Sequence, residues 1–278
     1  MDLYALTLAQ AEKPGPAGCE EIDARDKRRQ ARPHPPRPQG PSGNRRHRRA
    51  RTGARGQLAR PLPALTEVFG DLVSGAQIQA LGQKALAVQA DVADPESIKE
   101  AFEIFRKEFN RVDIVISNAA IGVLKPAMEL TLKHFRRCME TNALALNSLA
   151  QNAVPMMPEG GCLIGLSSLG SVRAVPHYSF IGASKAALES LARGLAQELG
   201  HTKKIRVNIV SAGVVDTDAL KYFPNREQLL AEYARRTPIG PTLTPEQVAN
   251  AVYLLCLPEA SMITGHTLIV DGGYCISG

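Results

Sequence analysis

The chain has 278 residues, 44% of them hydrophobic and with no Trp, which is enough for one large α/β domain with a buried core. No apolar run approaches the roughly 20 residues that a membrane helix needs, and no basic segment precedes the short apolar stretch at the N-terminus, so we expect neither a membrane protein nor a secreted one. The five cysteines show no pairing or metal-ligand spacing, and we expect reduced thiols, no metal and a cytoplasmic location.

The net charge of +6 is unevenly distributed along the chain. Residues 1–60 hold 14 Lys or Arg against 6 Asp or Glu, a net +8, and the rest of the chain holds 19 against 21, a net −2. Residues 13–63 are rich in Arg and Pro without any helical or strand period, so they cannot bury enough apolar surface to offset their ordering entropy. A basic nucleic-acid arm is the other interpretation, but no aromatic residues alternate with the arginines, and we expect no nucleic-acid partner.

This change in composition divides the chain into two parts. Residues 1–73 form an atypical segment that we expect to be disordered or out of frame, and residues 74–278 form the folded domain. In chain order, the domain is predicted to contain a helix end at 78–82, a strand at 85–91, an amphipathic helix at 95–109, an apolar strand at 112–117, a helix at 132–157, a strand at 162–167, a helix at 178–199, a strand at 205–210, a helix at 244–256 and a strand at 267–270. This alternation predicts right-handed βαβ units in a Rossmann-like, doubly wound parallel sheet.

The strongest chemical signal comes from three residues that follow the strand at 162–167. Ser168 follows that strand, and Tyr178 and Lys185 stand on the next helix. Seven residues separate the tyrosine from the lysine, so they lie two turns apart on one helix face. A nearby ammonium favours the phenolate and lets tyrosine exchange a proton near neutral pH, and a serine hydroxyl can hydrogen-bond an oxygen that gains charge. These residue types predict proton transfer at the end of a parallel strand.

Further motifs, in the same order, resemble the short-chain dehydrogenase/reductase family over residues 74–278. The motifs are Asp91-Val92, Ser117-Asn118-Ala119-Ala120-x-Gly122, Asn142 in Thr-Asn-Ala, Asn208 to Gly213 with Thr217, and Ile263-Thr-Gly265 to Gly273. The resemblance implies catalytic roles for Tyr178, Lys185, Ser168 and Asn142. It implies cofactor contacts from Asp91, Val92, Asn118, Ala119, Ala120, Lys185, Gly213, Val215 and Thr217.

The position of the tyrosine departs from the common family pattern. Tyrosine normally stands four residues before the lysine and 13 after the serine, and both counts lead here to Ile181. Tyr178 lies one turn earlier, and this Tyr-x6-Lys spacing resembles the enoyl-(acyl carrier protein) reductases, in particular the FabL-type branch through the segments 167–173 and 216–226. In conjugate reduction the charge builds on the thioester oxygen, one bond beyond the reacting alkene, so a donor displaced by one turn suits that chemistry.

The resemblance implies an enoyl-(acyl carrier protein) reductase that reduces trans-2-enoyl thioesters in fatty acid biosynthesis. It implies NADPH as cofactor with NADH as the alternative, acyl carrier protein or an acyl-CoA thioester as partner, and a homotetramer packed through small residues of the helices at 132–157 and 178–199. Substrate contacts are expected from Leu169, Tyr178, Leu220 and Phe223. Residues 217–233 would cover the acyl chain as a lid, and an ordinary surface helix is the other interpretation of that segment.

Two other functions stay open. A ketone or alcohol dehydrogenase, of the ketoacyl reductase or hydroxysteroid dehydrogenase type, is the alternative within the same class, and Ile181 argues against it. A cofactor-free oligomeric scaffold without activity is the alternative from another class, because no strand followed by a glycine-rich phosphate-binding turn is found between Met1 and Gly75.

A shift of reading frame is our hypothesis for the missing turn. With CGG codons for arginine and CAT for histidine, Arg45-Arg46-His47-Arg48 read one nucleotide later becomes Gly-Gly-Ile-Gly, the core of the family's phosphate loop. A genuine basic extension in place of the loop is the alternative.

Overall fold

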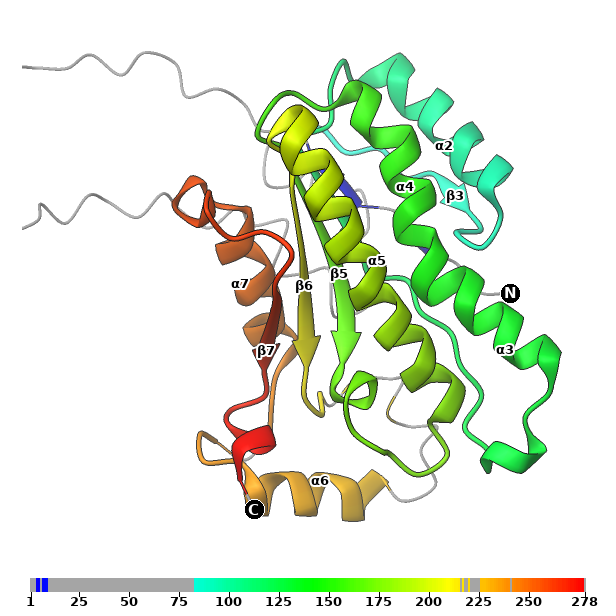
Figure 1. Cartoon of the computed structure of the whole chain (residues 1–278), viewed down its shortest axis with the longest axis vertical. Coiled ribbons are helices and arrows are strands. Elements are labelled where there is room, and N and C mark those ends of the chain that lie inside the picture. Colours follow the sequence, from blue (N-terminus) through cyan, green and yellow to red (C-terminus); the bar gives the residue numbers. More distant parts are fainter. Residues whose placement is uncertain are drawn as a thin grey trace, which may run out of the picture. The chain divides into compact units, whose positions relative to one another are not determined.

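The computed structural model of the chain describes residues 4–5, 7–9, 83–215, 217, 220, 226–240 and 242–277 (Figure 1). The chain divides into two compact units, residues 1–11 with 61–278 and residues 12–60. The second unit contains most of the Arg/Pro-rich segment and lies outside the described residues. The helix end expected at 78–82 lies outside them as well.

A five-stranded sheet in the order β2-β4-β5-β6-β7 forms the centre of the first unit. The strands are β2 (Thr7–Ala9), β4 (Ile114–Ser117), β5 (Cys162–Ser168), β6 (Arg206–Ala212) and β7 (Thr267–Val270). β4 to β7 run parallel, and β4 is buried along its whole length, as expected for strands covered on both faces. The predicted fold class, a Rossmann-like doubly wound parallel sheet, is confirmed.

Helices cover both faces of this sheet (Figure 1). Leu163 of β5 packs into one core cluster with α2 (Pro95–Glu108), α4 (Ala145–Ala153) and α5 (Ser179–Lys203). The next residue, Ile164, packs into a second cluster with α7 (Pro245–Cys256). Successive strand residues point to opposite faces, so a single strand supplies both cores. The apolar face predicted for the helix at 95–109 is confirmed, since Ile98, Ala101, Phe102 and Phe105 are buried.

The predicted helix at 132–157 is continuous but changes its hydrogen bonding midway. α3 (Leu132–Met139) passes into a five-residue π-helical turn, η3 (Glu140–Leu144), before α4 begins. A π-turn adds a residue to the helical repeat and is frequent at functional sites. This turn holds Asn142, whose side chain is buried.

The N-terminal residues differ from the expectation that nothing before residue 74 joins the fold. β1 (Tyr4–Ala5) pairs with β3 (Gln89–Ala90), and β2 pairs with β4, both antiparallel. A strand edge without a neighbour leaves backbone N–H and C=O groups unpaired. β1 and β2 provide hydrogen-bonding partners for such groups of β3 and β4. The strand predicted at 85–91 is reduced to Gln89–Ala90 for the same reason, because β1 offers it partners along two residues only.

The remaining described elements are a helix after β6 and a set of short helical turns. α6 (Arg226–Arg236) follows β6, and the short helical turns are η2 (Ala127–Glu129), η4 (Val154–Met156), η5 (Leu169–Ser171), η7 (Pro258–Ala260) and η8 (Tyr274–Ile276). No helix in the described part of the chain is long and apolar enough to cross a membrane. Nor do three or more His, Cys, Asp or Glu side chains gather as a metal site among those residues.

The packing of α5 against the sheet predicts unequal costs for two leucines on that helix. Leu188 is 1% exposed and packs against β5, whereas Leu191 is 37% exposed. Leu188→Ala should lower the free energy of unfolding by about 2–5 kcal/mol, since it leaves a cavity. Leu191→Ala is the matched control and should cost less than about 1 kcal/mol. Urea titrations measure both, and equal losses would contradict this assignment of the core.

Candidate active site

The predicted site residues gather at the carboxyl edge of the parallel strands. Ser168, the last residue of β5, pairs with Ala212, the last residue of β6, and Ala212 pairs with Val270, the last residue of β7. Gly213 follows β6 directly, and Asn118 follows β4. Ligands of doubly wound sheets bind at this edge.

Tyr178 lies beside Ser168, as the sequence predicted. The two hydroxyl oxygens are 3.2 Å apart. A Cβ atom on Gly170 would stand 2.5 Å from Cε1 of Tyr178, so the tyrosine ring packs directly on that glycine. Burial raises the pKa of Tyr178, and the hydrogen bond with Ser168 opposes that rise. The lowering expected from Lys185 is therefore wrong for this structure, and Tyr178 stays a neutral hydrogen-bond donor at neutral pH.

Lys185 is buried two turns further along α5. Its Nζ donates a hydrogen bond of 2.7 Å to the carbonyl oxygen of Leu166 in β5. Burial lowers the pKa of Lys185 to about 8, while interactions with Cys138 and Glu189 act in the opposite direction. A lysine with a pKa this close to neutral pH can both bind as an ammonium and release a proton.

Asn142 joins the turn after β4 to α5. Its Nδ2 donates to the Ile121 carbonyl at 2.8 Å and to Ser184 Oγ at 2.9 Å. Its Oδ1 accepts from the Ile121 amide at 2.8 Å. These contacts are to backbone and to Ser184, so in this structure the asparagine side chain positions the turn that contains Asn118, Ala119 and Ala120.

Ile181 fills the position where the family's usual tyrosine stands. It is 8% exposed, and a Cβ atom on Gly122 would come within 2.1 Å of its Cδ1 atom. The side chain therefore packs tightly on the turn after β4. The hydroxyl near this position comes from Tyr178, three residues earlier, which is the N-cap residue of α5 and not, as expected, a residue within the helix.

Asp91 and Val92 lie at the end of β3. Val92 is buried in the main core, and the Asp91 carboxylate accepts from the Ala93 amide at 3.0 Å. Arg137 of α3 donates to both carboxylate oxygens, at 3.0 and 3.3 Å. This arginine could not be predicted from the sequence, because a pairing across 46 residues leaves no local pattern.

Gly213 lies against the hydroxyl end of Tyr233, a residue of α6, and no local sequence pattern indicates this contact. A Cβ atom on Gly213 would stand 2.2 Å from the Tyr233 hydroxyl, which donates to the Asp271 carbonyl at 2.7 Å. Burial first, and then the charge of Asp271, raise the pKa of Tyr233 to about 12. α6 is therefore anchored at this end to the segment expected to contact the nicotinamide.

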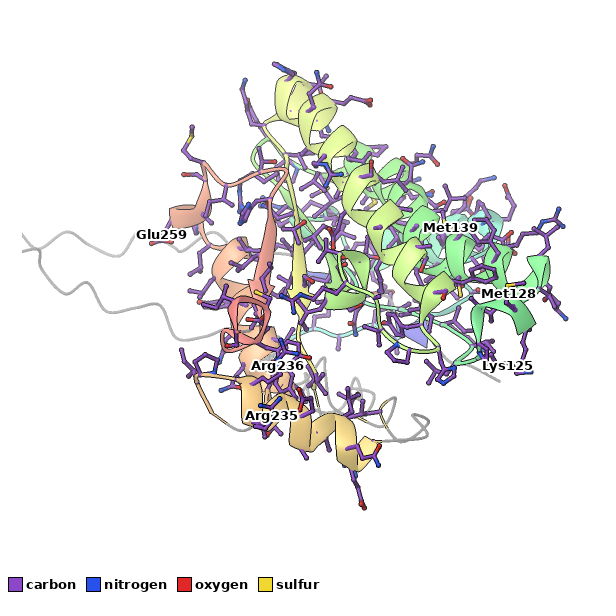
Figure 2. The ribbon with its side chains drawn as sticks, turned by 60° about the horizontal axis from the view of Figure 1, so that its bottom comes forward. Lys125, Met128, Met139, Arg235, Arg236 and Glu259 are labelled. Atoms are coloured by element: carbon purple, nitrogen blue, oxygen red, sulfur yellow. The ribbon has the colours of Figure 1, made fainter. Side chains whose placement is uncertain are left out.

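The C-terminal turn provides a second anchor for α6. Tyr233 stacks on Tyr274 with their ring centroids 4.8 Å apart, and the Arg236 guanidinium lies 4.7 Å from the Tyr274 ring. Arg236 also donates to the Ser277 carbonyl at 2.8 Å, and it lies at the C-terminal end of α6 (Figure 2). The end of α6 is thus held by aromatic and cationic contacts together.

The structure describes most of the other predicted site residues, but not Phe223. Val215 forms an isolated bridge with Leu243, and the Thr217 carbonyl accepts from the Leu220 amide at 2.9 Å. Leu220 is buried, and so is Leu169 in the turn after β5. Phe223 and the neighbouring residues 221–225 lie outside the described residues, so the contact expected from Phe223 stays a prediction.

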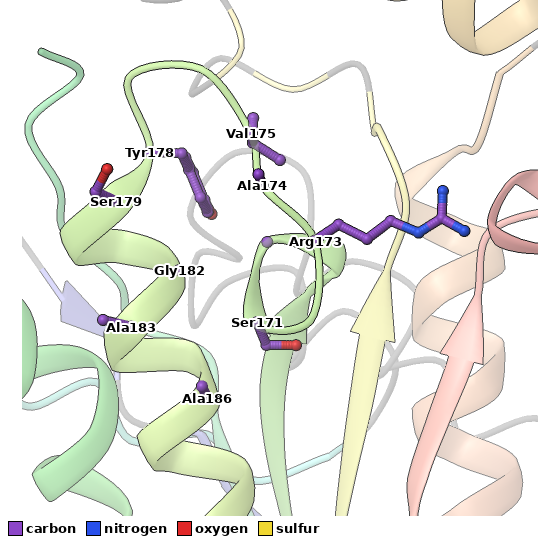
Figure 3. Close-up of a pocket in the computed structure, with 10 residues that line it drawn as sticks. Ser171, Arg173, Ala174, Val175, Tyr178, Ser179, Gly182, Ala183 and Ala186 are labelled. Carbon is purple, nitrogen blue, oxygen red and sulfur yellow. The ribbon is translucent and has the colours of Figure 1, made fainter. Parts of the chain in front are cut away.

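A pocket of about 240 Å³ opens beside Tyr178, between the turn after β5 and α5, as Figure 3 shows. Small side chains make up most of its wall, among them Gly170, Ser171, Ala174, Gly182, Ala183 and Ala186. Arg173 extends from this wall to the C-terminal turn, where it donates to the Cys275 carbonyl. The wall therefore combines small apolar side chains with the polar groups of Ser171, Ser179 and Arg173.

The donor set at this edge fits the nicotinamide end of a dinucleotide. Two hydroxyls and a buried ammonium come from Ser168, Tyr178 and Lys185, close to the turns that follow β4 and β6. The residues expected to hold the pyrophosphate precede residue 83 and lie outside the described main body, and the sequence there contains no glycine-rich turn.

A doubly wound sheet with serine, tyrosine and lysine at its carboxyl edge defines an oxidoreductase of the short-chain dehydrogenase/reductase class. Residues 68–275 match the family model described as "Enoyl-(Acyl carrier protein) reductase", and the chain belongs to that family.

Curated relatives include both enoyl and alcohol chemistries. The 1-cyclohexenylcarbonyl-CoA reductase of Streptomyces collinus is 36% identical over 203 residues, covering 72% of this chain and 72% of that protein. The 7alpha-hydroxysteroid dehydrogenase of Escherichia coli K12 is 33% identical over 201 residues, covering 71% of this chain and 77% of that protein. Sequence identity at this level supports the class of enzyme. It does not determine the substrate, which has to be inferred from the geometry of the site.

Solved structures of enoyl-(acyl carrier protein) reductases share the fold. The enzyme from Anaplasma phagocytophilum in complex with NAD has a TM-score of 0.66 at 30% identity, covering 73% of this chain and 76% of that one. The Bacillus cereus enzyme with NADP⁺ and an indole naphthyridinone has a TM-score of 0.68 at 31% identity, covering 73% and 82%. Relatives thus bind either nicotinamide dinucleotide.

The contact between Gly213 and Tyr233 predicts non-additive mutations. Gly213→Ala should lower the free energy of unfolding by about 1–3 kcal/mol, because the new methyl group meets the Tyr233 hydroxyl. Tyr233→Phe removes that hydroxyl and its hydrogen bond, and should cost about 0.5–1.5 kcal/mol. The double variant should lose less than the sum of the two, as measured in a urea double-mutant cycle.

Gly194→Ala is the control for this cycle. A Cβ atom at Gly194, in the middle of α5, meets nothing within 4 Å, so alanine should be neutral or stabilising there. Strict additivity of Gly213→Ala and Tyr233→Phe would show that the two residues do not share this space.

Proposed function

We propose that the chain is an enoyl-thioester reductase that reduces trans-2-enoyl groups carried by acyl carrier protein or coenzyme A, in fatty acid biosynthesis. The observation that carries the proposal is the position of Tyr178, 3.2 Å from Ser168, with Ile181 filling the place one turn later. Conjugate reduction needs a hydrogen-bond donor near the thioester oxygen, displaced from the donor position that a ketone oxygen would need.

In this proposal Tyr178, Ser168 and Lys185 each have a separate role in the reaction. Tyr178 donates to the thioester oxygen as charge builds there, and its raised pKa keeps it a phenol at neutral pH. Ser168 orients the phenol through the hydroxyl contact. Lys185 binds the nicotinamide ribose as an ammonium and returns a proton to the site, which its pKa of about 8 allows.

The cofactor in this proposal is NADPH, with NADH as the alternative. Bound in reduced form, it supplies the hydride. The residues that would hold it are Asp91 and Val92 at the adenine, the 118–120 turn and Lys185 at the ribose, and Gly213, Val215 and Thr217 at the nicotinamide. The Bacillus cereus relative with NADP⁺ supports the choice, and the Anaplasma relative with NAD supports the alternative.

The acyl chain would lie against the pocket wall beside Tyr178 and under α6. Leu169 and Leu220, whose side chains are buried, are proposed as contacts of the acyl chain, and Phe223 is proposed as a further contact. The anchoring of α6 through Tyr233 implies that any lid movement takes place toward its N-terminal end.

Tyr178→Phe tests the chemistry. It keeps the ring on Gly170 and removes the donor, so turnover of a trans-2-enoyl thioester with NADPH should fall by ~10²–10³. Ser168→Ala should cost less, because it only orients the phenol. Calorimetry with NADPH and NADH comes first, and it should give the same affinity for the wild type and for Tyr178→Phe.

Three outcomes would contradict the proposal. Full enoyl reduction by Tyr178→Phe would remove the role of the phenol. A 3-ketoacyl thioester or a secondary alcohol that is turned over faster than the enoyl thioester would favour the ketone or alcohol dehydrogenase. Absence of binding to either cofactor would favour the scaffold.

We also propose that the chain assembles as a homotetramer. The small residues expected to face a partner are Ala143, Ala145, Ala150, Ala186, Ala187 and Ala192. Four of them, Ala143, Ala145, Ala150 and Ala192, are buried in the core of the subunit and do not support the assembly, while Ala186 and Ala187 are half-buried. Exposed apolar residues on the segment at 132–157, Leu132 and Leu144, support the proposal instead. Light scattering at micromolar concentration should give the mass of four chains, and a monodisperse monomer would overturn the assembly.

A further inference from the structure

Glu189 is a buried carboxylate that has no part in the proposed reaction as described so far. It is 8% exposed and lies one helical turn after Lys185, in the buried stripe of α5. Within that stripe, Lys185 and Glu189 are the two charged side chains. Burying a carboxylate costs several kcal/mol unless hydrogen bonds and an opposite charge offset the lost hydration. A glutamate at this position therefore needs a hydrogen-bond donor and a positive charge nearby.

β5 holds Glu189 next to the lysine. Ser167 Oγ donates a hydrogen bond of 2.6 Å to Glu189 Oε1, and both residues are buried. Lys185 Nζ donates to the carbonyl oxygen of Leu166, the residue just before Ser167. The carboxylate and the ammonium are thus tied to consecutive residues of one strand, and they are also one turn apart on one helix. Two separate elements fix their relative position.

Glu189 supplies the negative charge that acts on Lys185. Cys138 of α3 also faces the lysine, but burial raises the pKa of its thiol, so it is neutral at neutral pH. α4 has no titratable side chain. The other titratable groups on elements packed against α5 are Lys133, His134, Arg136 and Arg137 of α3, the exposed Glu140 on the π-turn, Cys162 at the start of β5, and Arg206 of β6, which donates to the Leu255 carbonyl.

We infer that Glu189 is a positioning residue that keeps Lys185 protonated at neutral pH, with Ser167 holding the carboxylate in place. The inference rests on the role that the proposed function gives to the Lys185 ammonium. Burial alone favours the neutral amine, and an opposite charge nearby in a medium of low polarity favours the ammonium. Without Glu189, a larger share of the chains would carry a neutral lysine, which cannot supply a proton to the site.

The charge state of Lys185 can be measured without cofactor or substrate. Lysine labelled with ¹³C at Cε reports its own titration by NMR, and the resonance of Lys185 is the one missing from a Lys185→Met chain. In Glu189→Gln the titration midpoint should fall by about one pH unit. Glu198→Gln is the matched control, because it removes the same charge from an exposed position on the same helix and should leave the midpoint unchanged.

The activity profile gives a second measurement. For enoyl reduction, kcat/KM of Glu189→Gln should match the wild type near pH 6, where Lys185 is protonated in both. Near pH 8 it should be about fivefold lower, since a midpoint lowered by one unit leaves far less ammonium. A merely structural role for Glu189 would lower kcat/KM by the same factor at every pH.

An unchanged Lys185 midpoint in a folded Glu189→Gln chain overturns the inference. If that variant does not fold, Glu189→Asp replaces it, since it withdraws the charge by one methylene and should give a smaller fall, and an unchanged midpoint there overturns the inference equally. A lowered midpoint in a chain whose wild type reduces no enoyl thioester supports the Glu189–Lys185 coupling and contradicts the proposed function, so the two failures are distinct.

Discussion

Two glycines let the turn after β5 lie directly on the first turn of α5, and the rest of the site depends on this close approach. A Cβ atom on Gly182 would stand 2.5 Å from the Gly170 carbonyl oxygen, and one on Gly170 would meet the Tyr178 ring. With the strand end and the helix start in contact, Ser168 and Tyr178 come within hydrogen-bonding distance. The helical repeat then brings Lys185 back to the same strand two turns later, where it reaches Leu166. Any side chain at either glycine would separate the hydroxyls and change the position of the lysine.

Most of the secondary structure could be predicted, because the hydrophobic period of each element is long and undisturbed. The strand at 267–270 was predicted to the residue, and the helix at 95–109 to within one. The π-turn at 140–144 could not be predicted, since a change in backbone hydrogen bonding leaves no mark on the pattern of apolar residues. The shortening of β3 could not be predicted either, because it depends on how far a distant strand extends beside it.

The site shows the same division between local and tertiary information. Spacing along one helix places Tyr178 and Lys185 on one face, and it identifies Ile181 as the replaced position. The direction of the Tyr178 pKa depends on burial, which only the packed structure determines. Six alanines were assigned to a partner because their small size suits close packing, but the core of the subunit already buries four of them, Ala143, Ala145, Ala150 and Ala192. Arg137 and Tyr233 contact their partners from far along the chain and had no local signal.

The direction of β2 has a consequence for how a dinucleotide can be held. Ala9, the last residue of β2, pairs with Ile114, the first residue of β4, while Thr7 pairs with Ile116. β2 therefore ends at the edge of the sheet opposite Ser168, whereas a parallel strand beside β4 would end at the catalytic edge. In doubly wound sheets the turn that wraps the pyrophosphate follows such a parallel strand. Among the described residues, the groups proposed to contact a dinucleotide are therefore those at its adenine end and at its nicotinamide end.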